Sequence, residues 1–376
     1  MTNYLKLALI LTTLPFVFAI ACEGVVDSDS PTTDIRIVDT GQETCYDNSD
    51  PIAPPSAGEP FCGQDAQYQG VQFFFIDNGD GTVTDINTGL MWQQTPSPTS
   101  FGWQDAMDYC TSLDLAGYDD WRAPTLKELF SISDFSSGWP YIDTSYFDLV
   151  GEVVSKDEQY WSSNYYYVGT THGGLETAFG VNHGTGHIKG YPLGETGPGP
   201  SGNYVRAVRG DTTYGQNVFN DNGDGTVTDQ ATGLMWMQAD SIEPLDWEHA
   251  LAYADSLSLA GYDDWRLPNI KELQSIVDYS GVFPAIDLLF ECTGIINEAG
   301  DPDYGYYWSG TSSYFGPDAP DYYYAWYTAF GFAVDDAGQD SHGAGAVRFD
   351  TKVEGGPSGE GGERYYNFVR CVREIE

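Results

Sequence analysis

The sequence is poor in basic residues. Its 376 residues include only 15 Lys and Arg against 56 Asp and Glu, which gives a formal charge of −41 at pH 7. A nucleic-acid-binding protein needs a basic face that displaces the counterions of the phosphates, and so few basic residues do not build one. Nucleic acid is therefore excluded as a partner. Anionic membranes and polysaccharides are repelled unless a cation bridges them.

Long apolar stretches are also scarce. The one present, residues 7–21, follows Lys6 and has the length of a signal-peptide core rather than of a membrane span. It ends in small residues directly before Cys22, which resembles a bacterial lipobox. We expect 1–21 to be a signal peptide and Cys22 to be lipidated, with cleavage after Ala21 without lipidation as the alternative. The mature chain is then exported to the outer membrane or cell surface of a bacterium, and it contacts the membrane only through its anchor.

Motifs for catalysis are missing as well. There are five histidines, and neither a Gly-x-Ser-x-Gly elbow nor a phosphate-binding loop occurs. Hydrophobic residues make up 41% of the chain and aromatic residues 15%, enough for well-packed cores. The sequence thus predicts a folded protein that binds rather than catalyses. A hydrolase with an unrecognised carboxylate site is kept as an alternative.

What is present is an internal duplication. Asp77–Asp85 recurs as Asp221–Asp229 at a spacing of 144 residues, and the same spacing relates Leu115–Arg122 to Leu259–Arg266. Further on, the spacing drifts, and the matches are Trp161 with Trp308, Thr177–Gly180 with Thr328–Gly331, and Asn203–Arg206 with Asn367–Arg370. The duplication predicts two domains, 73–211 and 217–375, after a tether at 22–72.

Each copy has the same expected layout. A hairpin with an Asn-Gly-Asp-Gly turn comes first, then a short strand, and then a helix from Trp103 that ends at Gly117. A second helix begins with a capping box, Thr125 with Glu128 in the first copy. After it, the sequence becomes rich in Gly, Tyr and Ser, which predicts long loops with short strands. A closing strand at 204–208 or 368–372 completes the copy.

The ordered motifs resemble one family of bacterial surface domains. They are Asp-Asn-Gly-Asp-Gly-Thr-Val-Thr-Asp, Thr-Gly-Leu-Met-Trp, Ala-Gly-Tyr-Asp-Asp-Trp-Arg, Lys-Glu-Leu after a Pro-capped start, and Val-Arg-Cys-Val-Arg. The family is named for the C-terminal domain of the Legionella collagen-like protein. The resemblance implies an α+β fold: two tandem C-type lectin-like domains, each with two helices packed on a small, mostly antiparallel sheet with long loops. It also implies adhesion, and the named member is associated with glycosaminoglycans, which the charge of this chain disfavours unless calcium bridges.

Two cysteines lie in the loop-rich stretch before the first copy. Cys45 and Cys62 are close in sequence, and export permits disulfides. We expect these two to form a local bridge, with separate bonds to distant cysteines as the alternative.

The resemblance implies another disulfide, between the first helix and the last strand of a copy. The first copy keeps Cys110 but has Ala207 in the last strand, and the second keeps Cys371 but has Ala254 in the helix. Cys371 is then left to pair with Cys292 in its own copy, which we favour, or with Cys110 of the other copy.

The hairpin turns carry repeated aspartates. Carboxylates in a turn suit calcium, although the spacing does not match an EF-hand loop. The alternative is that these side chains bond local backbone amides. Calcium is therefore a possible cofactor, with the candidate ligands Asp77, Asp80 and Asp85 and their counterparts Asp221, Asp224 and Asp229.

Aromatic residues in the glycine-rich half of each copy are the candidate ligand contacts. Aromatic faces stack on sugar rings and anchor protein interfaces, although strand alternation buries about half of them. The expected partner is a glycan or a surface protein, and self-association as an envelope component is the alternative; the oligomeric state is left open. The candidate residues are Tyr165, Tyr166, Tyr322, Tyr324 and Trp326.

Overall fold

The structure, a computed structural model, describes residues 36–375 except 152, 194–201, 315–321, 358–361 and 363. The predicted signal peptide and Cys22 lie outside the described residues. Both copies belong to one unit, Asp34–Glu376. In the described part of the chain, no helix is long and apolar enough to cross a membrane.

Each copy begins with the predicted hairpin, which belongs to a four-stranded antiparallel sheet. The turn places Gly79 at φ +73° and Gly81 at φ +88°, a conformation that glycine adopts without strain. The sheet orders are β3-β4-β5-β9 and β10-β11-β12-β18. The strands are β3 (Phe75–Asp77), β4 (Thr82–Asp85), β5 (Met91–Gln93), β9 (Val208–Arg209), β10 (Phe219–Asp221), β11 (Thr226–Asp229), β12 (Leu234–Met237) and β18 (Val372–Glu374). The closing strands are shorter than predicted.

Two helices per copy follow from local sequence signals. The capping box of the second helix is present: Thr125 Oγ1 accepts from Glu128 N at 3.2 Å, and Glu128 accepts from Thr125 N at 2.8 Å. Gly117 does not end the first helix; it lies in the turn beyond, at φ +79°. The helices are α1 (Trp103–Ser112) and α2 (Leu126–Ser131) in the first copy, and α4 (Trp247–Asp255) and α5 (Ile270–Ser275) in the second.

The repeated motifs maintain this scaffold. Arg122 donates to both carboxylate oxygens of the capping Glu128 at 2.7 Å. Arg209 of the closing strand donates to Asp120, and its guanidinium lies 3.8 Å from the Tyr118 ring centroid. The second copy repeats these contacts, with the pairs Arg266–Glu272 and Arg373–Asp264. The motifs shared by the copies are therefore structural.

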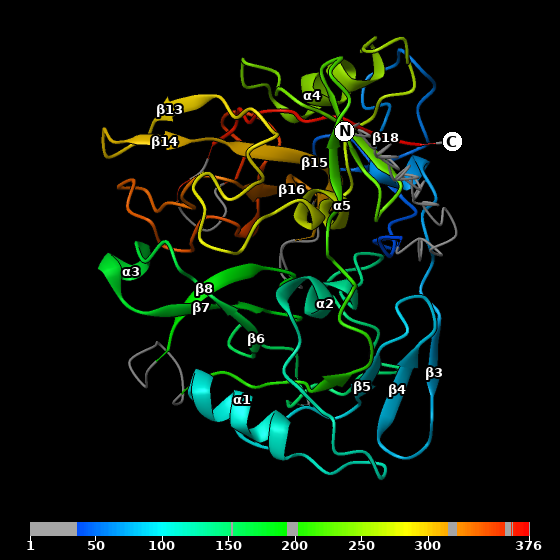
Figure 1. Cartoon of the computed structure of the whole chain (residues 1–376). Coiled ribbons are helices and arrows are strands. Elements are labelled where there is room, and N and C mark those ends of the chain that lie inside the picture. Colours follow the sequence, from blue (N-terminus) through cyan, green and yellow to red (C-terminus); the bar gives the residue numbers. More distant parts are fainter. Residues whose placement is uncertain are drawn as a thin grey trace, which may run out of the picture. The chain divides into compact units, whose positions relative to one another are not determined.

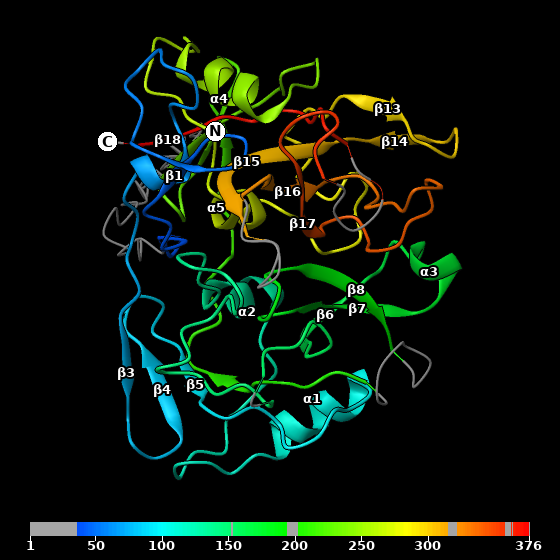
Figure 2. The same cartoon turned by 180° about the vertical axis from the view of Figure 1, so that it is seen from behind.

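A six-stranded antiparallel sheet joins the two copies (Figures 1 and 2). Its order is β15-β16-β17-β8-β7-β6, and the copies meet where Ile188 pairs with Val347. The sequence predicts only loops with short strands in this region. The strands are β6 (Tyr160–Tyr165), β7 (Thr177–Val181), β8 (Ile188–Pro192), β15 (Tyr306–Ser313), β16 (Tyr324–Ala329) and β17 (Val347–Thr351).

Strand register corrects the alignment of the copies. Trp161 pairs with Gly180, and Trp308 pairs with Tyr327. Phe179 is thus equivalent to Trp326, at the 147-residue spacing of Trp161 and Trp308. The expected match of Thr177–Gly180 with Thr328–Gly331 is wrong. The same registers make Ile188 and Val347, which pair with each other, equivalent residues.

Contacts between the copies are reciprocal. Lys127 Nζ donates to Ser275 O at 2.6 Å, and the equivalent Lys271 Nζ donates to Ser131 O at 2.8 Å. Contacts that repeat with the partners exchanged are the mark of a twofold interface. We infer a pseudo-twofold axis that passes between α2 and α5 and between β8 and β17.

One apolar core spans both copies, with a smaller core in each. Trp326 is fully buried and makes edge contacts with Phe135 and Tyr141 of the first copy, at centroid distances of 5.3 and 5.4 Å. Phe179 and Tyr279 form the equivalent contact at 5.1 Å. Because the copies share this core, they fold as one unit.

The described part of the predicted tether, 36–72, packs against the second copy. Gln42 bonds the backbone of Ser312, and Asp65 accepts from Thr311 Oγ1 at 2.6 Å. This segment and the remaining loops contain β1 (Cys45–Tyr46), β2 (Pro51–Ile52), the 3-10 turn η1 (Asp65–Gln67), the short helical turn α3 (Thr171–Gly174), β13 (Gly294–Ile296) and β14 (Pro302–Tyr304). The fold is mixed α and β, and its mostly antiparallel sheets outweigh the few short helices.

Candidate binding cleft

Three of the five aromatic residues predicted to bind ligand are in the core. Tyr166, Tyr324 and Trp326 are exposed by 2%, 3% and 0%. Every residue of β16 is buried, so this strand has no solvent face of the kind that alternation predicts. These three are corrected to core residues. Tyr322 is partly exposed but stacks on Tyr46, with ring centroids 3.7 Å apart.

The fifth residue, Tyr165, lines an open cleft of about 570 Å³ between the copies. The first copy contributes polar and aromatic side chains, the segment 212–219 forms one wall, and the turn after α5 closes the other side. The main lining residues are Thr125, Lys127, Ser163, Asn164, Tyr165, Tyr167, Tyr214, Asn217, Phe219, Asp278, Tyr279 and Asp287.

An aromatic wall crosses this cleft. Tyr167 is 67% exposed, and its ring centroid lies 4.9 Å from that of Tyr165, which in turn contacts Trp103 at 6.1 Å. A Cβ on Gly281 of the second copy would lie 2.6 Å from Tyr167 Cβ, so glycine at this position lets the two copies approach. The wall therefore depends on both copies.

Two hydrogen-bond donors in the cleft have no acceptor within the described residues. Asn164 Oδ1 accepts from Leu126 N at 2.8 Å, and within the described residues its amide nitrogen donates to no acceptor. The Tyr279 N–H likewise has no acceptor in the described part of the chain. Backbone and amide donors left open beside an aromatic wall are typical of a ligand site.

The charged side chains in the cleft already form hydrogen bonds within the protein. Burial lowers the pKa of Lys127 to about 8, and its ammonium donates to Gly215 O, Asn217 Oδ1 and Ser275 O at 3.0, 2.8 and 2.6 Å. Asp278 and Asp287 each accept a backbone amide at 2.8 Å. With one lysine and two aspartates, the cleft does not attract a polyanion.

The hairpin aspartates do not converge on a cation site. Asp77 accepts from Gly79 N at 2.8 Å, and Asp80 accepts from Thr82 Oγ1 at 2.6 Å. Asp85 accepts from Asn87 N at 3.0 Å. The second copy does the same with Asp221, Asp224 and Asp229. Within the described ranges, no group of three His, Cys, Asp or Glu is placed to hold a metal. These carboxylates bond the turn, as the alternative interpretation expects.

All five described cysteines are free, and neither predicted disulfide is formed. Cys45 and Cys62 are neighbours: burial, and then the nearby Cys62, raise the pKa of the Cys45 thiol. Cys292 Sγ lies 3.6 Å from the Arg370 guanidinium, whereas Cys371, the next residue, points into the core of the second copy. Cys371 belongs to that small core, whereas Cys292 packs against the core shared by the two copies.

Each copy nevertheless has one cysteine and one alanine at the two positions of the disulfide that the family resemblance implies, and both positions lie in the same core. Cys110 and Ala207 share the small core of the first copy, and Ala254 and Cys371 share that of the second. All four are buried. The copies have thus kept opposite members of one buried pair of positions.

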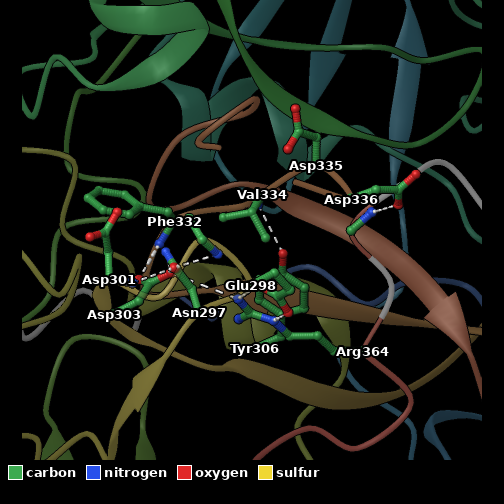
Figure 3. Close-up of polar contacts among 12 residues, drawn as sticks. Asn297, Glu298, Asp301, Asp303, Tyr306, Phe332, Val334, Asp335, Asp336 and Arg364 are labelled. Atoms are coloured by element: carbon green, nitrogen blue, oxygen red, sulfur yellow. Dashed lines mark hydrogen bonds and ion pairs between the residues drawn. The ribbon is translucent and has the colours of Figure 1, made fainter. Parts of the chain in front are cut away.

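A second polar cluster lies in the longer loops of the second copy (Figure 3). Arg364 donates to both oxygens of Glu298 at 2.9 and 2.8 Å and lies 4.2 Å from the Tyr306 ring centroid. Burial raises the pKa of Asp303, which accepts from the backbone of Tyr304 and Phe332 at 2.7 and 3.0 Å. Its carboxylate is sealed from solvent. This cluster ties the loops of the second copy together.

Sequence reasoning misses Asn164, Tyr167 and Tyr279. Tyr167 is the last member of a Tyr-Tyr-Tyr run whose first two members, Tyr165 and Tyr166, are the predicted ligand contacts, and Asn164 and Tyr279 carry no motif. Only the pairing of the copies brings these three to one cleft.

The fold and cleft define a tandem module in which the motifs shared by the two copies build the scaffold and the loops between them line a cleft. The family profile of the Lcl C-terminal domain matches residues 81–209 and 225–373, more than half of the chain. The chain belongs to the Lcl C-terminal domain family, in two tandem copies. Comparison with curated proteins finds no match. Comparison with solved structures finds none either.

Proposed function

We propose that this chain is an exported surface binding protein whose two copies together form one ligand cleft. The observation that carries the proposal is the cleft itself: Tyr167 is exposed, and the Asn164 amide and the Tyr279 N–H have no partner among the described residues. An exposed aromatic side chain beside hydrogen-bond donors that the protein does not use is typical of a ligand-binding cleft.

We also propose that each copy is a C-type lectin-like domain, with two helices beside antiparallel sheets and long loops on one side. The function proposed is binding without turnover, because the lining contains neither histidine nor cysteine and its two aspartates hold turns. Anchoring through Cys22 at the outer membrane or cell surface completes the proposal. Labelling cells with a radioactive fatty acid tests the anchor: the label is expected in the wild type and absent from Cys22→Ser, and an equally labelled variant would contradict it.

The binding proposal is tested by screening the mature chain against a glycan array and a random heptapeptide library. Tyr167→Ala removes the exposed wall of the cleft, and Tyr366→Ala is the matched control, since Tyr366 is 47% exposed and does not line the cleft. We expect binding that Tyr167→Ala weakens at least tenfold and Tyr366→Ala leaves unchanged. If no ligand depends on Tyr167 and the protein forms concentration-dependent oligomers, an envelope component that self-associates replaces the binding protein.

A further inference from the structure

The pseudo-twofold axis gives the open cleft a counterpart on the other side of the molecule. Four residues that line the open cleft, Lys127, Asn164, Tyr165 and Tyr279, are equivalent to Lys271, Thr311, Ser312 and Phe135. The equivalence of Asn164 and Thr311 is direct, because each side chain accepts from the first backbone amide of the adjacent helix, at 2.8 and 3.0 Å.

The counterpart is filled by the chain's own N-terminal segment. Lys271 Nζ donates to Asp39 O at 2.8 Å, and Phe135 N donates to Thr40 O at 2.7 Å. The Gln42 side chain bonds both the amide and the carbonyl of Ser312, at 2.9 and 3.0 Å. Residues 39–42 therefore lie along this cleft with their backbone and one side-chain amide engaged.

A second contact of the segment comes from η1. Thr311 Oγ1 donates to the buried carboxylate of Asp65 at 2.6 Å. A Cβ at Gly310 would lie only 3.1 Å from Asp65 N. The equivalent residue in the open cleft is Ser163, which has a Cβ, so the open cleft has less room for an η1-like turn. The part of the filled site that carries over is the strand at 39–42.

The open cleft keeps the groups that hold this strand. Tyr279 N–H takes the place of Phe135 N–H, and Tyr165 takes the place of Ser312. The Asn164 amide takes the place of the Thr311 hydroxyl, which bonds Asp65 and not the strand. Lys127 is the exception, because its ammonium donates to Gly215 O and Asn217 Oδ1. Gly215 is equivalent to Val71, whose carbonyl accepts from Asp39 N in the filled site. The exposed Tyr167 ring adds apolar cover.

We propose that the open cleft binds an extended segment of another polypeptide, in the manner in which residues 39–42 occupy the filled cleft. The ligand offers a backbone carbonyl to Tyr279 N–H, and a side-chain amide of the Gln type pairs with the backbone of Tyr165. This assignment rests on the proposed function and names its ligand class.

The test uses the full mature chain and a fluorescein-labelled peptide with the sequence of residues 37–43, Ile-Val-Asp-Thr-Gly-Gln-Glu. Fluorescence anisotropy is expected to show saturable binding that a scrambled peptide lacks. Tyr167→Ala, which removes the exposed ring of the cleft, and a peptide with Ala for its Gln are each expected to bind about tenfold more weakly. For the altered peptide, this is the effect of one lost hydrogen bond of about 1.4 kcal/mol. Tyr366→Ala binds like the wild type.

The outcomes separate the two proposals. If neither this peptide nor any heptapeptide selected from a random library binds in a Tyr167-dependent way, while an oligosaccharide does, the polypeptide assignment is overturned and the binding function stands. If no ligand of either class depends on Tyr167, both are overturned. Peptide binding that Tyr167→Ala leaves unchanged places the peptide elsewhere and also overturns the assignment.

Discussion

Replacing Asp65 with Asn is expected to stabilise the protein at neutral pH and to do so less in acid. Asp65 is buried beneath the N-terminal segment and accepts from Thr40 Oγ1 at 2.7 Å and from Thr311 Oγ1 at 2.6 Å. Two neutral hydroxyls do not compensate a buried charge, and burial raises the pKa of this carboxyl from 3.8 to about 7. Asn retains an oxygen that accepts both bonds and carries no charge.

The sign and size follow from proton linkage. Because the folded pKa is above the unfolded one, the native state binds the extra proton, and the stabilisation is lost as pH rises from about 4 to about 7. One pKa unit corresponds to about 1.4 kcal/mol. Between pH 5 and pH 8 the wild type therefore loses about 3 kcal/mol at this site, and Asp65→Asn does not.

The assay is urea unfolding followed by tryptophan fluorescence at pH 5 and pH 8. The stability gained by Asp65→Asn is expected to be about 3 kcal/mol larger at pH 8 than at pH 5. The control is Gln42→Ala, which loosens the same segment without removing a titratable group, and its cost should be equal at the two pH values. An Asp65→Asn effect that is independent of pH, or larger in acid, would refute the reasoning.

Three further predictions concern the scaffold and the cleft. Ala207→Cys is expected to form a disulfide with Cys110, detected as loss of both thiols to Ellman's reagent and a stabilisation of about 2–4 kcal/mol; two free thiols would contradict the shared core position. Arg266→Lys breaks a two-bond ion pair whose arginine side chain is 8% exposed, and it should lower the free energy of unfolding by about 1–3 kcal/mol. Arg122→Lys, at 25% exposure, should lower it less, and an equal or reversed order in urea unfolding would count against the role of burial. Gly281 has φ +99°, so Gly281→Ala strains the backbone and also pushes on Tyr167; it is expected to lower the unfolding midpoint in urea and to weaken peptide binding measured by anisotropy below the unfolding transition, and unchanged binding would show that the wall does not need the second copy.

Local features of the fold are predictable from the sequence. The hairpin glycines and the capping pairs, Thr125 with Glu128 and Asn269 with Glu272, act over four residues or fewer, and the structure confirms both capping boxes. The family assignment also follows, since its motifs recur at fixed spacing and the family profile matches both copies.

Features that depend on distant pairing are not predictable in this way. The six-stranded sheet requires Ile188 to meet Val347, and nothing local to either strand specifies that contact. The identical Thr-Ala-Phe-Gly segments suggested one alignment, whereas strand register sets another. Trp326 looked like a ligand contact because it lies in a run of tyrosines, but the first copy covers it with Phe135 and Tyr141.

Composition also misleads at the N-terminal segment. Its Pro, Ser, Asp and Thr content is typical of a tether, yet Gln42 and Asp65 hold it in a cleft to which both copies contribute. These are polar contacts made one residue at a time, so they leave no periodic signal. The candidate site could not be derived from the sequence, because it is the unfilled equivalent of that cleft.

Amide hydrogen exchange at two equivalent positions tests the central claim most directly. The Phe135 N–H is bonded to Thr40 O at 2.7 Å, while the Tyr279 N–H has no acceptor among the described residues. In the free protein, Phe135 is expected to exchange slowly and Tyr279 quickly, and saturation with the 37–43 peptide should slow Tyr279 without changing Phe135. If Tyr279 is already as protected as Phe135, or stays unprotected when the peptide is bound, the claim that the open cleft is the vacant counterpart of the filled one is contradicted.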